Sequence, residues 1–102
     1  MQTANFMVVG ILQNEPTLLV NDKNKTYSRF TLAVTKKDKT RFYDVIVRRG
    51  YKKTSRYAKG DTIMVQGRPI VEIEQYSCVN NPTAIKCKGR LVVRANKCDL
   101  LG

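Results

Sequence analysis

Hydrophobic and polar residues alternate along several segments of the chain, which is the pattern of β-strands that bury one face. The clearest case is Thr26–Thr35, where Phe30, Leu32 and Val34 occupy every second position. Successive side chains of a strand point to opposite faces, so these three residues predict a core face. The opposite face then carries Tyr27, Arg29, Thr31, Ala33 and Thr35.

A second alternating segment, Arg41–Arg49, follows the short charged stretch Lys36-Lys37-Asp38-Lys39. The short connection predicts an antiparallel hairpin. One face, expected in the core, carries Tyr43, Val45 and Val47, and the other carries Phe42, Asp44, Ile46 and Arg48. Because Phe42 and Tyr43 are adjacent, one ring must face outward. We expect this to be Phe42, whereas a register one residue off would bury it.

Other strands are expected at Asn5–Leu12, from Asp61 to Arg68, at Val71–Tyr76 and within Ile85–Ala95. Gly10 inside the first indicates a bulge or bend, and Pro69 either breaks the ladder or marks an edge. In the last strand, the core residues are Leu91 with either Val92 or Val93.

Tyr51–Lys59 is the one segment that predicts a helix, of about two turns, closed by Gly60. Asn80-Asn81-Pro82 predicts a turn. If Val71–Tyr76 is counted with the hairpin between the fourth and fifth strands, the resulting order is five strands with one short helix between the third and fourth. It predicts an all-β, five-stranded OB-fold, a Greek-key barrel, formed as one domain over residues 1–102.

The chain is strongly basic. It has 19 Lys and Arg residues but only 8 Asp and Glu, which gives a formal net charge of +11. Such a balance predicts a polyanionic partner, nucleic acid first and an anionic membrane second. A membrane surface would need a basic amphipathic helix, which the pattern does not contain. A cationic surface kept for solubility is the alternative. No apolar run reaches about 20 residues and no basic leader precedes one, so a cytoplasmic protein is expected.

The residues for catalysis or metal binding are sparse. The chain has no histidine and three cysteines, Cys78, Cys87 and Cys98, which are expected to be reduced and to act as small buried hydrophobes. A Cys78–Cys87 contact across a hairpin is possible. Glu72 and Glu74 share a strand face and are interpreted as an edge-strand solubility device. We therefore expect a non-enzymatic protein without a metal or cofactor.

The outward faces of the second and third strands combine aromatic rings with cations, which suits unpaired nucleic acid: bases stack on rings and phosphates pair with cations. Arg29, Arg41 and Arg68 are expected on outward faces. Tyr27 and Tyr76 are interpreted either as stacking residues or as caps of the barrel rim, and Tyr51 and Tyr57 as packing residues. The predicted nucleic-acid-binding residues are Tyr27, Arg29, Lys36, Lys37, Arg41, Phe42, Arg48, Arg68 and Tyr76.

The segments Asn5–Gly10, Phe30–Val34 and Phe42–Val47, with Pro16, Lys59-Gly60 and Val65-Gln-Gly67-Arg68, resemble the pattern of bacterial single-stranded DNA-binding proteins. A weaker likeness continues in Leu91–Val93 and Leu100–Gly102. The resemblance implies a base-stacking role for Phe42. Arg48 stands where another stacking aromatic is common, and its guanidinium would serve as the substitute. Tyr76 would replace a further aromatic.

The resemblance also implies binding of single-stranded DNA with little sequence specificity, in replication or recombination, by a homodimer or homotetramer. The chain departs from the family in having no tryptophan, a shorter helix, and an end at Asp99–Gly102 without an acidic tail. We therefore expect a compact phage, plasmid or mobile-element version, or a relative of the primosomal replication protein. The alternatives are a primosome or helicase accessory that acts through protein contacts, and an RNA-binding OB-fold.

Overall fold

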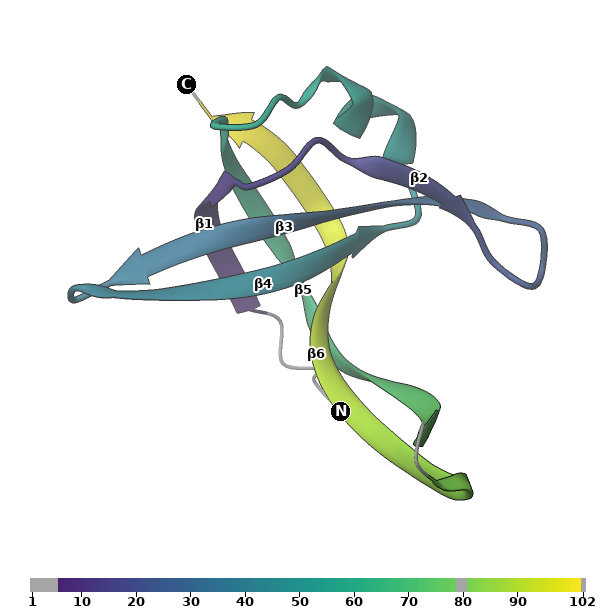
Figure 1. Ribbon diagram of the computed structural model, residues 1–102. Helices are drawn as coiled ribbons and strands as arrows, with labels where there is room; N and C mark the ends of the chain where they lie inside the picture. Colours follow the sequence, from purple (N-terminus) through teal and green to yellow (C-terminus); the bar gives the residue numbers. More distant parts are fainter. Residues whose placement is uncertain (1–5, 79–80, 102) are drawn as a thin grey trace, which may run out of the picture.

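The computed structural model (Figure 1) describes residues 6–78 and 81–101, and describes side chains outside residues 73–90. The elements are β1 (Phe6–Leu12), β2 (Thr17–Val20), β3 (Thr26–Lys36), β4 (Lys39–Val47), the 3₁₀ helix η1 (Tyr51–Arg56), β5 (Thr62–Cys78) and β6 (Asn81–Leu101). None of the helices in these ranges is long and apolar enough to span a membrane.

The strands form one sheet in the order β1-β5-β6-β4-β3-β2, and a further pairing of β1 with β3 closes it into a barrel. β4 and β6 run parallel, and the other neighbours run antiparallel. Two hairpins extend past the barrel on opposite sides in Figure 1, β2–β3 and β3–β4, and the paired strands β5 and β6 form a long arm below. The predicted all-β barrel with one short helix is therefore present.

The barrel core consists of the residues that the alternation assigned to it. Phe30 and Leu32 are buried, and so are Val45 and Val65. Tyr57, which follows η1, lies edge-on to Phe30 at 6.1 Å between ring centroids. In β6, Val92 and Val93 are both buried while Leu91 is exposed. Of the two valines, Val93 belongs to the barrel core cluster and Val92 does not, and the prediction that Leu91 belongs to the core is wrong.

Two glycines allow close approach of strands. At Gly10, just before β1 begins to pair with β3 as well as β5, a Cβ atom would lie 2.7 Å from the Ala33 carbonyl oxygen. The close approach of the Ala33 backbone is one reason for a glycine inside a strand, and the predicted bulge or bend at Gly10 stays a prediction. Gly67 lies at a β-bulge opposite Ala95, and a Cβ there would overlap the Arg94 carbonyl. Both positions therefore require glycine for space.

Several predicted boundaries were wrong. The strand β2 was missed, because its four residues follow a proline and show no alternation. The helix ends at Arg56, not at Lys59, because Tyr57 has an extended backbone that turns its ring into the core. At Gly60, which was expected to close the helix, φ is +95°, so glycine is needed there in the loop before β5.

β5 and β6 are longer than predicted. β5 continues through Pro69, which lies beyond Gly67, the last β5 residue paired with the described part of β1. Of the two interpretations of Pro69, the edge position is the one observed, since a proline cannot donate to a second neighbour. Asn81 and Pro82 belong to β6, so the predicted turn was wrong at these residues, and Asn80 lies outside the described residues.

Candidate nucleic-acid interface

Phe42 is the most exposed aromatic ring in the described part of the chain, with 67% of its surface accessible. It lies on the outer face of β4, opposite Ala33 of β3. The next residue, Tyr43, points to the inner face and packs against Phe6, with 6.3 Å between ring centroids. The predicted register of β4 is therefore confirmed, and Phe42 is free to contact a ligand.

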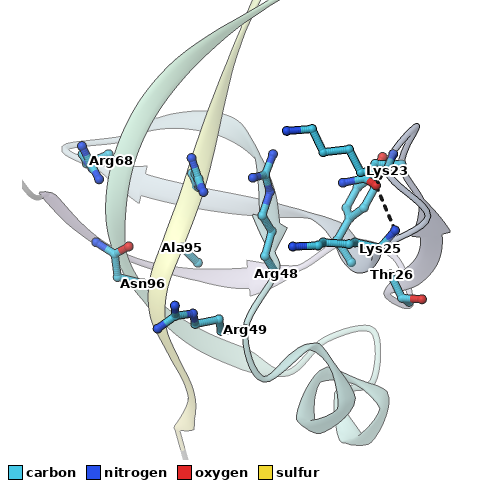
Figure 2. Close-up of a pocket in the computed structure, with 11 residues that line it drawn as sticks. Lys23, Lys25, Thr26, Arg48, Arg49, Arg68, Ala95 and Asn96 are labelled. Atoms are coloured by element: carbon cyan, nitrogen blue, oxygen red, sulfur yellow. Dashed lines mark hydrogen bonds between the residues drawn. The ribbon is translucent and has the colours of Figure 1, made fainter.

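A groove of about 610 Å³ lies between the β2–β3 turn, the end of β4, and strands β5 and β6 (Figure 2). We call it the basic groove. It is lined by Asn21, Lys23, Lys25, Thr26, Tyr27, Arg48, Arg49, Arg68, Arg94, Ala95 and Asn96. Six of these residues are cationic and none is acidic. Such a concentration of one charge attracts anions into the groove.

Different parts of the fold bring the cations of the basic groove together. Arg68 of β5 and Arg94 of β6 are cross-strand partners, so two guanidinium groups share one rung of the sheet. Figure 2 shows Lys23 and Lys25 extending from the β2–β3 turn toward Arg48. The Asn21 carboxamide oxygen fixes this turn by accepting hydrogen bonds from the backbone N–H of Lys23 at 3.0 Å and of Lys25 at 2.9 Å. Like charges repel at these positions, and a bound anion would relieve the repulsion.

A second basic pocket, of about 380 Å³, lies at the end of the β3–β4 hairpin. We call it the hairpin pocket, and it is lined by Val34, Lys36, Lys37, Lys39, Arg41 and Tyr43. Lys37 and Asp38 form the two-residue turn with φ of +47° and +66°, as hairpin turns that match the strand twist require. Arg41 was expected on an outward face, but it shares the inner face of β4 with Tyr43. Arg41 is nevertheless exposed, because the hairpin extends beyond the barrel.

Arg29 lies between the two basic sites and already has anionic partners. Its guanidinium donates to Glu72 at 3.1 Å and to Asp44 at 3.3 Å, and Thr31 also donates to Asp44, at 2.9 Å. Burial lowers the pKa of Arg29, but the hydrogen bonds and charges of Glu72 and Asp44 outweigh this, and the net pKa is raised. We call Arg29, Asp44 and Glu72 the central triad.

The central triad changes two interpretations drawn from the sequence. Arg29 was predicted to contact phosphate, and its guanidinium would have to leave two carboxylates to do so. Glu72 was interpreted as a solubility residue, which is wrong, because it is half-buried and pairs with Arg29 across the sheet. The side chain of Glu74 lies outside those described. Asp44 is the cross-strand partner of Val92 of β6, which is completely buried outside the core cluster.

The structure distributes the predicted binding residues over both basic sites. Tyr27, Arg48 and Arg68 line the basic groove, and Lys36, Lys37 and Arg41 line the hairpin pocket. Tyr76 belongs to the β5–β6 arm, and its side chain lies outside those described. The sequence reasoning missed Lys23, Lys25, Arg49, Arg94 and Asn96. Cationic residues around a polar turn gave a signal for the lysines, but Arg94 needs the β5–β6 register to place it beside Arg68.

Cys98 is buried in the core, as predicted, and the Tyr57 hydroxyl lies 3.4 Å from its Sγ and donates to its carbonyl oxygen at 3.3 Å. Burial raises the pKa of the Cys98 thiol, and it also raises the pKa of Tyr57. These two groups stabilise the core and lie away from the basic groove. The side chains of Cys78 and Cys87 are outside those described.

No protein-family model and no curated protein matches the sequence. Solved structures do match its fold. The single-stranded DNA-binding protein from Thermus aquaticus aligns with a TM-score of 0.73 and 21% identity, over 96% of this chain and 40% of that chain. The mitochondrial single-stranded DNA-binding protein from S. cerevisiae aligns with a TM-score of 0.72 and 16% identity, over 99% of this chain and 97% of that chain.

These likenesses confirm the predicted fold: the chain is an OB-fold barrel of the kind found in single-stranded DNA-binding proteins. The chain spans about 40% of the length of the Thermus protein, and matches the yeast protein over nearly its full length. Because the identities are only 21% and 16%, the comparison establishes the arrangement of the strands alone.

Proposed function

We propose that this protein binds single-stranded DNA with little sequence specificity, by stacking bases on aromatic rings and pairing phosphates with cations. The observation that carries the proposal is the basic groove, where six cations and Tyr27 converge without an acidic residue among the lining side chains. Single-stranded nucleic acid needs both features, because each unpaired base offers a π-face and each nucleotide a negative charge.

Phe42 and Tyr27 supply the stacking surfaces in this proposal. Arg48 and Arg68, together with Lys36, Lys37 and Arg41, supply phosphate contacts. Arg29 holds the central triad together and contacts DNA only if it releases a carboxylate. Tyr76 keeps its predicted role as a further stacking residue on the β5–β6 arm. The solved structures with this fold support the proposal, since both are named as single-stranded DNA-binding proteins.

The proposed role is that of a non-enzymatic protein that protects or presents single strands during replication or recombination. A plasmid, phage or mobile-element context and a cytoplasmic location complete the proposal.

The proposal includes a homodimer or homotetramer, which a further feature of the surface supports. The outward face of β1 carries Met7, Val9 and Ile11, which are 60%, 43% and 51% exposed. A second copy of the chain covering this stripe would remove it from water.

A second candidate function is that of a primosome or helicase accessory that acts through protein contacts. The observation that favours it is the edge strand β2, where Leu18 and Val20 are 54% and 60% exposed. Apolar residues on an open strand edge suit a partner strand.

Titration of the protein with oligo-dT, with duplex DNA of equal length and with oligo-U tests the main proposal. We expect oligo-dT to bind at least tenfold more tightly than the duplex, because paired bases hide their faces from Phe42 and Tyr27. Equal affinity for oligo-dT and duplex would mean unspecific charge attraction and would refute the stacking mechanism. Tighter binding of oligo-U than of oligo-dT would indicate the RNA-binding alternative.

A further inference from the structure

The two basic sites lie at opposite ends of the β3–β4 sheet. The basic groove lies where β3 begins and β4 ends, and the hairpin pocket lies at the turn between them. In Figure 1 the β3–β4 hairpin projects from the barrel on the side opposite to the β2–β3 turn. Both sites lack acidic lining residues, so each can hold phosphate independently of the other.

The central triad separates the two sites. Its one guanidinium and two carboxylates carry a formal charge of −1, and all three charged groups already have partners at 3.1 to 3.3 Å. A phosphate placed over the triad would meet two like charges, and Arg29 could not turn to it without giving up its ion pairs with Glu72 and Asp44. The triad therefore offers a phosphate no unpaired cation between the two sites.

The separation between the sites exceeds the reach of a short oligonucleotide. From Tyr27 to Lys36 there are nine residue steps along β3, which correspond to roughly 30 Å at about 3.4 Å per residue. A strand stacked as in B-form DNA advances about 3.4 Å per nucleotide, so about nine nucleotides cover this distance. Four nucleotides can occupy one site but cannot bridge both.

We propose that the basic groove and the hairpin pocket are two separate phosphate sites that one single strand occupies together, passing over the central triad between them. This inference rests on the proposed function and adds to it a two-part footprint. The pocket faces the inner side of the hairpin and Phe42 faces the outer side, so the strand stacks on Phe42 and then turns around the hairpin. Tethering makes the second contact intramolecular, which strengthens binding by about 10²–10⁴-fold once the strand is long enough.

The test measures the affinity of the full chain for dT4 and dT12 by fluorescence anisotropy, with three triple variants. The groove variant is Arg48→Gln/Arg68→Gln/Arg94→Gln, and the hairpin variant is Lys36→Gln/Lys39→Gln/Arg41→Gln. The control variant is Lys52→Gln/Arg56→Gln/Lys59→Gln, on and just after η1. All three lower the formal net charge from +11 to +8, since each removes three exposed cations. Thermal unfolding confirms that each variant is folded.

In the wild type and the control variant, dT12 should bind at least about 100-fold more tightly than dT4. In the hairpin variant this ratio should fall below about 10, while the affinity for dT4 stays within about twofold of the wild type, because dT4 still occupies the groove. In the groove variant the affinity for dT12 should fall as well. The stoichiometry should remain one dT12 per chain.

Three results would overturn the two-part footprint. Wild-type affinity for dT12 in the hairpin variant, with loss in the groove variant, would mean that the groove is the whole site. Equal losses of dT4 and dT12 affinity in the hairpin variant would mean a single composite site. Two dT12 strands per chain, falling to one in the hairpin variant, would mean that the sites hold different strands. If the wild type binds no dT12, the proposed function fails together with this inference.

Discussion

At the scale of single residues, adjacent side chains of one strand face opposite sides of the sheet and have different roles. Phe42 and Tyr43 are neighbours in β4, yet the pleat sends the first ring into solvent and the second against Phe6 at the edge of the core. The same alternation gives Arg41 to the inner face and Arg48 to the basic groove. A function assigned to this strand therefore depends on a register that a shift of one residue would invert.

Replacement of Phe42 and replacement of Tyr43 should have clearly different effects on the stability of the protein. Phe42→Ala should change the free energy of unfolding by less than about 0.5 kcal/mol, because an exposed ring loses little packing. Tyr43→Ala should lower it by about 2–3 kcal/mol, since its ring is partly buried against Phe6. Chemical denaturation followed by circular dichroism measures both. A large loss for Phe42→Ala with no loss for Tyr43→Ala would show that the register is the reverse of the one described.

The buried side chains of Tyr57 and Cys98 should make the folded protein less stable at alkaline pH. Burial raises the pKa of both groups in the folded state, so the folded protein holds their protons more tightly than the unfolded chain does. Their contribution is complete below the ordinary values of 9.0 for the thiol and 10.0 for the phenol, and is lost as the pH rises beyond them. Urea titrations at pH 7, 9 and 10.5 should show a progressive fall in unfolding free energy. The unfolding free energy of the Tyr57→Phe variant should fall less between pH 9 and 10.5 than that of the wild type. An identical fall in both proteins would exclude Tyr57 as a cause.

At the scale of elements, the strands with one buried face were the part that the sequence could predict. Thr26–Thr35 matches β3 almost to the residue, because Phe30, Leu32 and Val34 alternate with polar residues. β2 carries no such signal, and its place is set by pairing with β3, which is a tertiary effect. The end of η1 is also tertiary, since the core contact of Tyr57 stops the helix.

The proposed binding surface was predictable only as far as it follows from single strands. The exposure of Phe42 follows from β4 alone. The hydrogen bonds of Arg29 to Glu72 join residues 43 positions apart, and the pairing of Arg68 with Arg94 depends on the register of β5 and β6. These relations between strands decide which cations remain available to a phosphate. Alternation within one strand carries no information about them.

The bulge of β5 gives a prediction at this scale. Gly67→Ala should lower the free energy of unfolding by more than about 3 kcal/mol, because the added Cβ would overlap the Arg94 backbone and force the strands apart. Gly60→Ala is the matched control. Its Cβ meets nothing within 4 Å, and only the positive φ opposes it, at about 1–2 kcal/mol. A loss for Gly67→Ala no larger than that for Gly60→Ala would mean that the bulge can relax.

At the scale of the whole molecule, much of the positive charge is concentrated at the two basic sites of the proposed binding surface. Ten of the 19 Lys and Arg residues line the two basic sites at the ends of the β3–β4 sheet, while the acidic residues of the central triad are neutralised in part by Arg29. This arrangement supports attraction of a polyanion by charge and its retention by stacking. Charge and stacking respond differently to salt, which makes them separable.

The salt dependence of oligo-dT affinity, measured for the wild type and Phe42→Ala, tests the central claim most directly. With about five phosphate contacts at about −0.7 each, log K against log salt should have a slope near −3.5 in both proteins. The Phe42→Ala line should lie parallel and below, weaker by about 1–3 kcal/mol, or about 5- to 150-fold, at every salt concentration. A flat salt response would contradict the role of the basic sites. Coincident lines for the two proteins would contradict base stacking on Phe42.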